Sequence, residues 1–154
     1  MLFKVVEVLA IVAAGLMVGN ELTVAVFLHP TLRKMPEGLH APARRAFAVL
    51  LGRAMPFWYA AVFLLTAWAA WIGPPLGSID GKLLLAAAIL WLLAIVYTLI
   101  LPAPLNSRIG QWQMQSLPAE WKAQGLRWDR YHAVRMVVIV AALVCLVAGS
   151  VVYG

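Results

Sequence analysis

The chain has 154 residues, of which 64% are hydrophobic and 12% are charged, and its net charge is +6. A soluble domain usually carries about 25% charged residues, so this composition predicts an integral membrane protein. The length allows one domain and excludes two. The basic residues lie between apolar segments, which indicates a topology signal and argues against a nucleic-acid-binding surface. The single cysteine, Cys145, excludes an intrachain disulfide and a paired-cysteine metal or redox site.

The first apolar segment covers about residues 5–29. It is too long for the apolar region of a typical signal peptide, so it is predicted to be the first membrane span. Pro30 should end this helix near His29, because the residue before a proline avoids the helical region. A basic connection with two further prolines is expected to follow over about residues 31–45.

The second span is expected at about residues 46–72, and it is interrupted by Arg53 and by Pro56, where a kinked helix fits. A glycine and two prolines then end the span. A short turn with Asp80 as the predicted N-cap leads into the third span. That span covers about residues 82–101, close to the length that a bilayer core requires.

The segment of residues 105–130 is polar and rich in tryptophan, and it is predicted to form a short interfacial helix and loop with a break at Gly125. The fourth span should cover about residues 131–153, with Tyr153 as an anchor at its far end. Long unbroken apolar runs argue against a transmembrane β-barrel. The predicted fold is therefore all-α: an integral membrane, up-down-up-down four-helix bundle with an interfacial helical segment before the fourth span. It forms a single domain over residues 1–154.

The basic residues also predict the orientation in the membrane. All of them except Lys4 and Lys82 lie in or beside the first and third connections. The positive-inside rule then places these connections in the cytoplasm and both termini outside it. We expect a multi-pass protein of the bacterial inner membrane whose partners are membrane lipids and a lipophilic small molecule, with no nucleic acid. The sequence leaves a homo-oligomer open.

An antiparallel bundle should bring polar residues of all four spans together on the cytoplasmic side. A charged group in the bilayer is costly unless it is paired or hydrated, so these side chains should face the bundle interior. Glu21 lies in the inner part of the first span, and His132 and Arg135 are its natural partners. Its functional interpretation is a proton acceptor or metal ligand, and its structural interpretation is a buried hydrogen bond that fixes helix packing.

Trp128, His132 and Arg135 follow the i, i+4, i+7 spacing of one helix face. Asp129 lies three residues before His132 and could orient its imidazole, and a histidine beside a carboxylate can act as a general base. The structural alternative is an interfacial histidine and a snorkelling arginine. The sequence requires no cofactor. A metal held by histidines and Glu21 stays open, although no helix carries HxxxH or ExxH spacing.

Further residues near this level are candidates for binding a substrate. Asn106 follows two prolines, and its amide could bond the carbonyls that they free or hold a substrate oxygen. Tryptophans in the third connection could form an interfacial belt or stack on a flat aromatic ligand. His29 could equally cap helix carbonyls. The candidate substrate-binding residues are Asn20, His29, Asn106, Trp112 and Trp128.

Motifs in both halves of the chain resemble a known family. Residues 101–106 read Leu-Pro-Ala-Pro-Leu-Asn, and residues 127–135 read Arg-Trp-Asp-x-x-His-x-x-Arg. Residues 19–22 read Gly-Asn-Glu-Leu, and residues 26–30 read Val-Phe-x-His-Pro. Together they resemble the DUF1772, anthrone-oxygenase-like membrane family over nearly the whole chain. A second four-helix membrane family shares features of the first span and is less similar around residues 127–135.

The resemblance implies an oxidoreductase that oxidises a lipophilic aromatic substrate, anthrone-like or quinol-like. A base would remove a proton from an activated ring carbon, and the resulting anion would react with oxygen. The implied base is His132, with Glu21 orienting or relaying, and with Arg135 and Asn106 stabilising the developing oxyanion. The alternative is a non-enzymatic bundle that binds a lipid or small molecule, or that serves as a subunit of a larger complex. The oxygenase predicts an enclosed cavity beside Glu21 and His132 that is wide enough for aromatic rings, whereas the binder predicts these residues paired with each other and no cavity.

Overall fold

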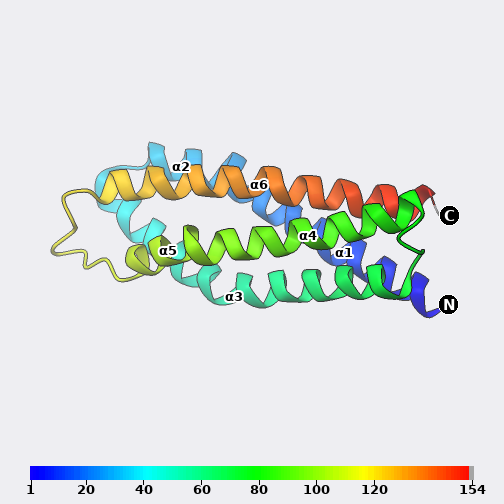
Figure 1. The fold of residues 1–154 in the computed structure, drawn as a ribbon. Coiled ribbons are helices and arrows are strands. Elements are labelled where there is room, and N and C mark those ends of the chain that lie inside the picture. The colour runs from blue at the N-terminus through cyan, green and yellow to red at the C-terminus, as the bar shows by residue number, and fades with distance from the viewer. Residues whose placement is uncertain (153–154) are drawn as a thin grey trace.

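The structure is a computed structural model that describes residues 1–152, and these residues form helices without strands (Figure 1). Four long apolar helices run up and down, and each is long enough to cross a membrane. The predicted four-helix membrane bundle is therefore confirmed. The predicted anchor Tyr153 lies outside the described residues. The long helices are α1 (Leu2–Thr23), α3 (Glu37–Ile72), α4 (Ile79–Ile100) and α6 (Trp121–Val152), and the shorter elements are η1 (Val24–Leu28), α2 (His29–Lys34) and α5 (Pro102–Gly110).

The bundle is a closed ring in which each long helix packs against two others. Helix α1 contacts α3 and α6, and α4 contacts the same two helices. Alanines at the centre let the helix backbones approach closely, which favours packing in a medium without a hydrophobic driving force between helices. These fully buried alanines are Ala10, Ala14, Ala87, Ala94 and Ala142.

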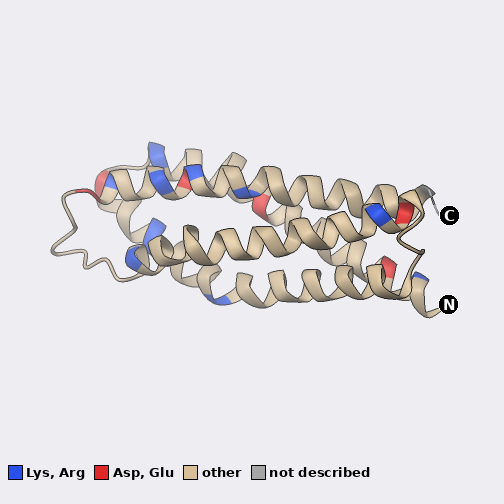
Figure 2. Cartoon of the chain, viewed as in Figure 1, with Lys and Arg blue, Asp and Glu red and all other residues tan. Residues whose placement is uncertain are grey.

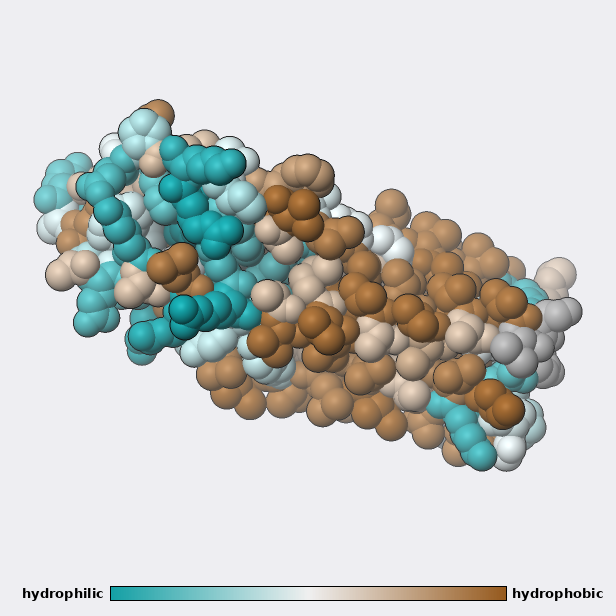
Figure 3. All heavy atoms as spheres, turned by 90° about the horizontal axis from the view of Figure 1, so that it is seen from above, coloured by the Kyte–Doolittle hydropathy of each residue, from teal (hydrophilic) through white to brown (hydrophobic). Residues whose placement is uncertain are grey.

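Charge divides the molecule into two ends. The terminal end holds both termini and the α3–α4 turn, and the loop end holds the α2–α3 and α5–α6 connections (Figure 1). Most lysines and arginines lie toward the loop end (Figure 2). The surface between the two ends is largely apolar (Figure 3), with valines and leucines such as Val12, Leu92 and Val144 exposed. Such a surface suits lipid tails rather than water.

The first helix does not end near His29 as predicted. The chain stays helical as far as Lys34, because the turn before Pro30 widens into the π-helix η1. The His29 N–H accordingly donates to the Val24 carbonyl, five residues back. Proline lacks an N–H and its ring clashes with the carbonyl four residues before it, and a wider turn accommodates both effects. Only Met35 and Pro36 then separate α2 from α3.

Two other helices extend beyond the predicted spans toward the loop end. Helix α3 begins at Glu37 rather than near residue 46, although it contains Pro42. Helix α6 begins at Trp121 rather than near residue 131, and Gly125 lies inside it instead of breaking it. Buried residues at the loop end form a second apolar cluster whose packing outweighs these unfavourable local propensities. The buried members are Ala41, Ala48, Leu105, Ile109 and Trp112.

The turn between α3 and α4 depends on Ser78 and Gly81. Ser78, rather than the predicted Asp80, is the N-cap of α4, and its Oγ accepts a hydrogen bond from the Gly81 N–H at 3.1 Å. Gly81 also faces the Pro75 carbonyl so closely that a Cβ built on it would lie 2.4 Å from that oxygen. Gly81 is therefore required for the close approach of this turn to the helix.

Replacing Gly81 with alanine is expected to destabilise the bundle by about 1–3 kcal/mol, because the backbone at Pro75 must shift. Thermal unfolding of the purified protein in detergent measures the effect. Gly77 in the same turn is the matched control, since a Cβ there would meet nothing within 4 Å. Equal melting temperatures for the Gly81→Ala and Gly77→Ala variants would contradict the prediction.

Candidate functional site

The polar residues lie at one depth of the bundle. A bilayer core about 30 Å thick corresponds to about 20 helical residues. Counting that length from the terminal end leads to Glu21 on α1, Arg53 on α3, Thr98 on α4 and His132 on α6. These four residues therefore lie at one level, where helices that start from the terminal end would have crossed a hydrocarbon core. Beyond it, the longer helices continue into the charged loop end.

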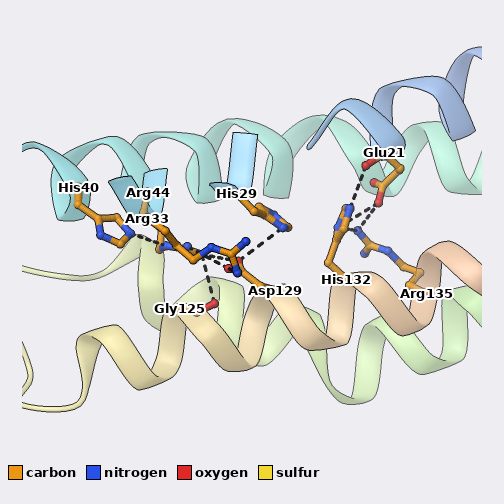
Figure 4. A network of polar contacts seen from close by, with 9 residues as sticks. All are labelled: Glu21, His29, Arg33, His40, Arg44, Gly125, Asp129, His132 and Arg135. Atoms are coloured by element: carbon orange, nitrogen blue, oxygen red, sulfur yellow. Dashed lines mark hydrogen bonds and ion pairs between the residues drawn. The ribbon is translucent and has the colours of Figure 1, made fainter. Parts of the chain in front are cut away.

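Glu21, His132 and Arg135 form a buried cluster between α1 and α6 (Figure 4). The Arg135 Nη2 donates to the Glu21 Oε2 at 2.6 Å, and the His132 Nδ1 lies 3.3 Å from the same oxygen. The predicted partnership of Glu21 with both residues is thus confirmed. In this buried position, the ion pair compensates two charges that would each be costly alone.

The hydrogen bonds of His132 determine which ring nitrogen carries the proton. Its Nε2 lies 3.0 Å from the backbone carbonyl oxygen of Glu21, which can only accept, so Nε2 is the donor. In neutral His132 the Nδ1 is therefore the acceptor, and the Arg135 Nη2 lies 3.1 Å from it. The basic lone pair of His132 consequently points toward the Arg135–Glu21 pair.

Aromatic rings enclose the other side of His132. The Trp128 ring stacks on the imidazole with ring centroids 5.4 Å apart. The His29 ring stands edge-on to both of them, with centroids 4.9 Å from each. This packing holds the His132 ring in one orientation.

A second buried network lies closer to the loop end (Figure 4). Asp129 does not contact His132 as the spacing had predicted; Arg44 donates to both its carboxylate oxygens, at 2.9 and 3.4 Å. The His29 Nδ1 lies 3.6 Å from the same carboxylate. Arg44 also donates to the Gly125 carbonyl at 3.3 Å, and a Cβ on Gly125 would lie 3.0 Å from its Nε. Gly125 thus admits Arg44 to the α6 backbone.

A pocket of about 550 Å³ lies directly beside the Glu21 cluster. This volume falls within the range of about 300–1,000 Å³ typical of small-molecule sites. Glu21, Trp128, His132 and Arg135 line its buried side. Its exposed rim is formed by residues of α3 on one side and of α4, α5 and the following residue on the other, so the pocket opens laterally between these elements. The rim residues are Arg53, Pro56, Ala60, Leu99, Ser107 and Gln111.

Several polar atoms of the pocket-lining residues are buried without a hydrogen-bond partner among the described residues. They are the hydroxyl of Tyr59, the Oδ1 of Asn106, the Nε1 of Trp128 and the Nε of Arg135. Buried polar groups are nearly always satisfied, so a set of exceptions at one pocket indicates a site for a polar ligand or water. The Trp128 and Arg135 nitrogens are donors, the Asn106 oxygen is an acceptor, and the Tyr59 hydroxyl can be either.

The sequence matches the family model described as anthrone oxygenase over residues 43–145. The chain belongs to the anthrone oxygenase family. The match covers α4, α5 and most of α3 and α6, and it therefore includes His132 and Arg135 but not Glu21. Neither the curated proteins nor the solved structures gave a match to this chain.

Of the residues predicted for the site of this anthrone oxygenase family member, five line the pocket: Glu21, Asn106, Trp128, His132 and Arg135. Three others lie elsewhere. Asn20 turns its amide nitrogen to the Met55 sulfur at 3.7 Å, and the buried Trp112 donates to the Gln124 side chain at 3.2 Å. His29 lies behind Trp128, beside a small second cavity.

Asn106 is held in an unexpected way. Its Nδ2 donates to the Ala48 carbonyl of α3 at 2.8 Å, not to a carbonyl freed by the preceding prolines. Gly52 permits this approach, because a Cβ there would lie 2.6 Å from the same nitrogen. The remaining atom, Oδ1, can only accept. In this arrangement the Oδ1 can accept from a substrate hydroxyl, and the second N–H of the Nδ2 leaves the implied donor role of Asn106 a prediction.

Two residues of these networks were not predicted from the sequence. Tyr59 lines the pocket from the middle of α3 and lies within an apolar segment of the sequence. Its position away from the helix ends was a signal, because tyrosines of membrane helices favour the interfaces. Arg44 had been counted among the topology charges. Within residues 1–152, no three histidine, cysteine, aspartate or glutamate side chains are grouped to hold a metal ion.

Proposed function

We propose that this protein is a membrane oxygenase that oxidises a lipophilic aromatic substrate of the anthrone class in the pocket beside Glu21, His132 and Arg135. The pocket is the observation that carries the proposal, because it combines an apolar wall with a buried acid, base and cation. Membership of the anthrone oxygenase family supports the same activity. A flat apolar molecule dissolved in the bilayer would enter through the lateral opening between α3 and the α4–α5 segment.

In the proposed reaction, a substrate oxygen first draws Arg135 away from the His132 Nδ1. This nitrogen then takes a proton from the activated ring carbon. The resulting imidazolium then faces the Glu21 Oε2, 3.3 Å away, which stabilises its charge. Arg135 stabilises the negative charge that develops on the substrate oxygen. The role of His132 as base thus depends on its tautomer, which the Glu21 carbonyl sets.

The remaining steps use molecular oxygen as the oxidant. The carbanion gives electrons to oxygen, a carbon–oxygen bond forms, and the peroxide anion recovers the proton from His132. Loss of water from the hydroperoxide leaves a carbonyl at the ring carbon. One anthrone and one oxygen molecule therefore give one anthraquinone and one water molecule.

Replacing His132 with alanine is expected to lower turnover at least about 100-fold, the usual contribution of a general base. Oxygen consumption and quinone absorbance, measured in lipid nanodiscs with empty nanodiscs subtracted, report the rate. His40→Ala is the matched control, because His40 contacts Arg44 and Trp121 outside the pocket. Retention of turnover by a folded His132→Ala variant would overturn the proposed function.

The pairing of Glu21 with His132 and Arg135 favours a second candidate, a non-enzymatic bundle that binds a lipid or small molecule. The pocket beside the pair favours the oxygenase, since the binder was expected to have none. Binding of an anthrone without oxidation of it by the wild-type protein would support the binder.

We also propose that the loop end faces the cytoplasm and that the protein lies in a bacterial inner membrane. The supporting observation is the concentration of lysine and arginine at the loop end (Figure 2). Proteolysis or cysteine labelling of the α5–α6 connection in intact and broken cells tests this orientation.

A further inference from the structure

We propose that the Tyr59 hydroxyl and the Arg135 guanidinium together bind the carbonyl or phenolate oxygen of the substrate at the buried side of the pocket. The inference rests on the proposed function and names the part of the substrate that the site recognises. Nothing in the family match or in the sequence pattern assigned a role to Tyr59.

Tyr59 is a buried phenol whose hydroxyl has no hydrogen-bond partner among the described residues. It lies on α3, lines the pocket, and stands edge-on to Trp91 with ring centroids 6.0 Å apart. Burying a hydroxyl without a partner destabilises the fold, and phenylalanine would fill the same space without this cost. A ligand that accepts a hydrogen bond supplies the missing partner.

Arg135 provides a second donor beside the first. Its guanidinium carbon lies 5.3 Å from the centroid of the Tyr59 ring. Its Nη2 is used by Glu21 and its Nη1 by Thr98, but its Nε is buried without a partner. Two free donors on neighbouring pocket-lining residues can serve one oxygen atom, as in the oxyanion holes of acyl-transfer enzymes.

The same two donors fit the chemistry of the proposed reaction. Removal of the proton from the ring carbon moves negative charge onto the carbonyl oxygen of the substrate. Hydrogen bonds to that oxygen therefore strengthen as the proton leaves. Asn106 is less suited to this role, because its Nδ2 already donates to the Ala48 carbonyl and its unpartnered atom, Oδ1, accepts. The ligand class is therefore a fused aromatic ring system with a carbonyl or phenolate oxygen.

The test compares two unreactive three-ring probes, anthraquinone with carbonyl oxygens and anthracene without them. Affinities are measured for the wild type and for Tyr59→Phe in lipid nanodiscs, with empty nanodiscs subtracted. We expect Tyr59→Phe to bind anthraquinone about five- to tenfold more weakly, the effect of one lost hydrogen bond, and to bind anthracene within about twofold of the wild type.

The melting temperature separates a binding role of Tyr59 from a structural role, because loss of a structural hydroxyl would lower it. Tyr59→Phe removes an unsatisfied hydroxyl, so its melting temperature should be unchanged or higher while the rate of anthrone oxidation falls. Tyr97→Phe is the matched control, because its hydroxyl donates to the Tyr131 carbonyl at 3.3 Å and Tyr97 does not line the pocket. It should leave both probe affinities unchanged.

The outcomes separate this inference from the proposed function. If the wild type binds neither probe, both the proposed function and the role of Tyr59 are overturned. If the wild type binds the probes and oxidises anthrone, but Tyr59→Phe binds anthraquinone as tightly as the wild type, the role of Tyr59 alone is overturned. An equal loss of affinity for both probes would also overturn it, because the hydroxyl would then not recognise oxygen.

Discussion

Replacing Arg135 with methionine is expected to abolish turnover and to lower the free energy of unfolding by about 3–5 kcal/mol. The variant leaves the Glu21 carboxylate, which is 2% exposed, without its cation. It also removes the donor to the His132 Nδ1 and the proposed donor to the substrate oxygen. Reversible unfolding in mixed micelles and oxygen consumption measure the two effects.

A double variant separates the stability of the pair from its chemistry. Changing Glu21 and Arg135 together to methionine replaces a buried ion pair with apolar side chains of similar size, which is often close to neutral for stability. We therefore expect the double variant to regain most of the lost stability and none of the turnover. A single Arg135→Met variant that is as stable as the wild type would show that Glu21 does not depend on this cation.

Replacing Asp129 with alanine is expected to destabilise the protein by about 3–5 kcal/mol, because Arg44 would remain buried and unpaired. Arg44 receives its compensation from a two-point contact with this carboxylate. Arg33 also lies 3.5 Å from it but is 46% exposed, so that contact adds little. The loss should appear in thermal unfolding of the variant.

The exposed pair of Glu37 and Lys122 offers a matched control for Asp129. It also joins α3 to α6, and its side chains are 74% and 58% exposed. Exposed ion pairs contribute about 0–1 kcal/mol, so Glu37→Ala should have a much smaller effect than Asp129→Ala. Similar losses in the two variants would contradict the prediction that Asp129 compensates a buried charge on Arg44.

Much of the fold could be predicted because it depends on local composition. The predicted third span, residues 82–101, nearly coincides with α4 at Ile79–Ile100, because no proline or charge interrupts the apolar run over residues 83–100. The predictions failed at Pro30, Pro42 and Gly125, which lie within helices. At each position, contacts with another part of the chain or a change in helix type outweighed the tendency of proline or glycine to end a helix.

Part of the site could be predicted for a different reason. The cost of burying a charge in the membrane restricts the partners of Glu21, and the i, i+4, i+7 spacing places Trp128, His132 and Arg135 on one face. The structure brings these residues together around one pocket. Asp129 shows the limit of such reasoning, since it is near His132 in sequence and pairs with Arg44, 85 residues away.

The sequence by itself therefore determined the four spans, their up-and-down order and the one level at which polar groups gather. Each depends on quantities summed along the chain, such as hydropathy over the length of a span. The tertiary structure decided which polar groups meet, that Arg135 bonds to Glu21 across 114 residues, and that a pocket remains beside them. These features depend on how each helix is rotated and shifted against its neighbours. Close packing at residues such as Gly52 and Ala14 determines this arrangement, and no local sequence pattern predicts it.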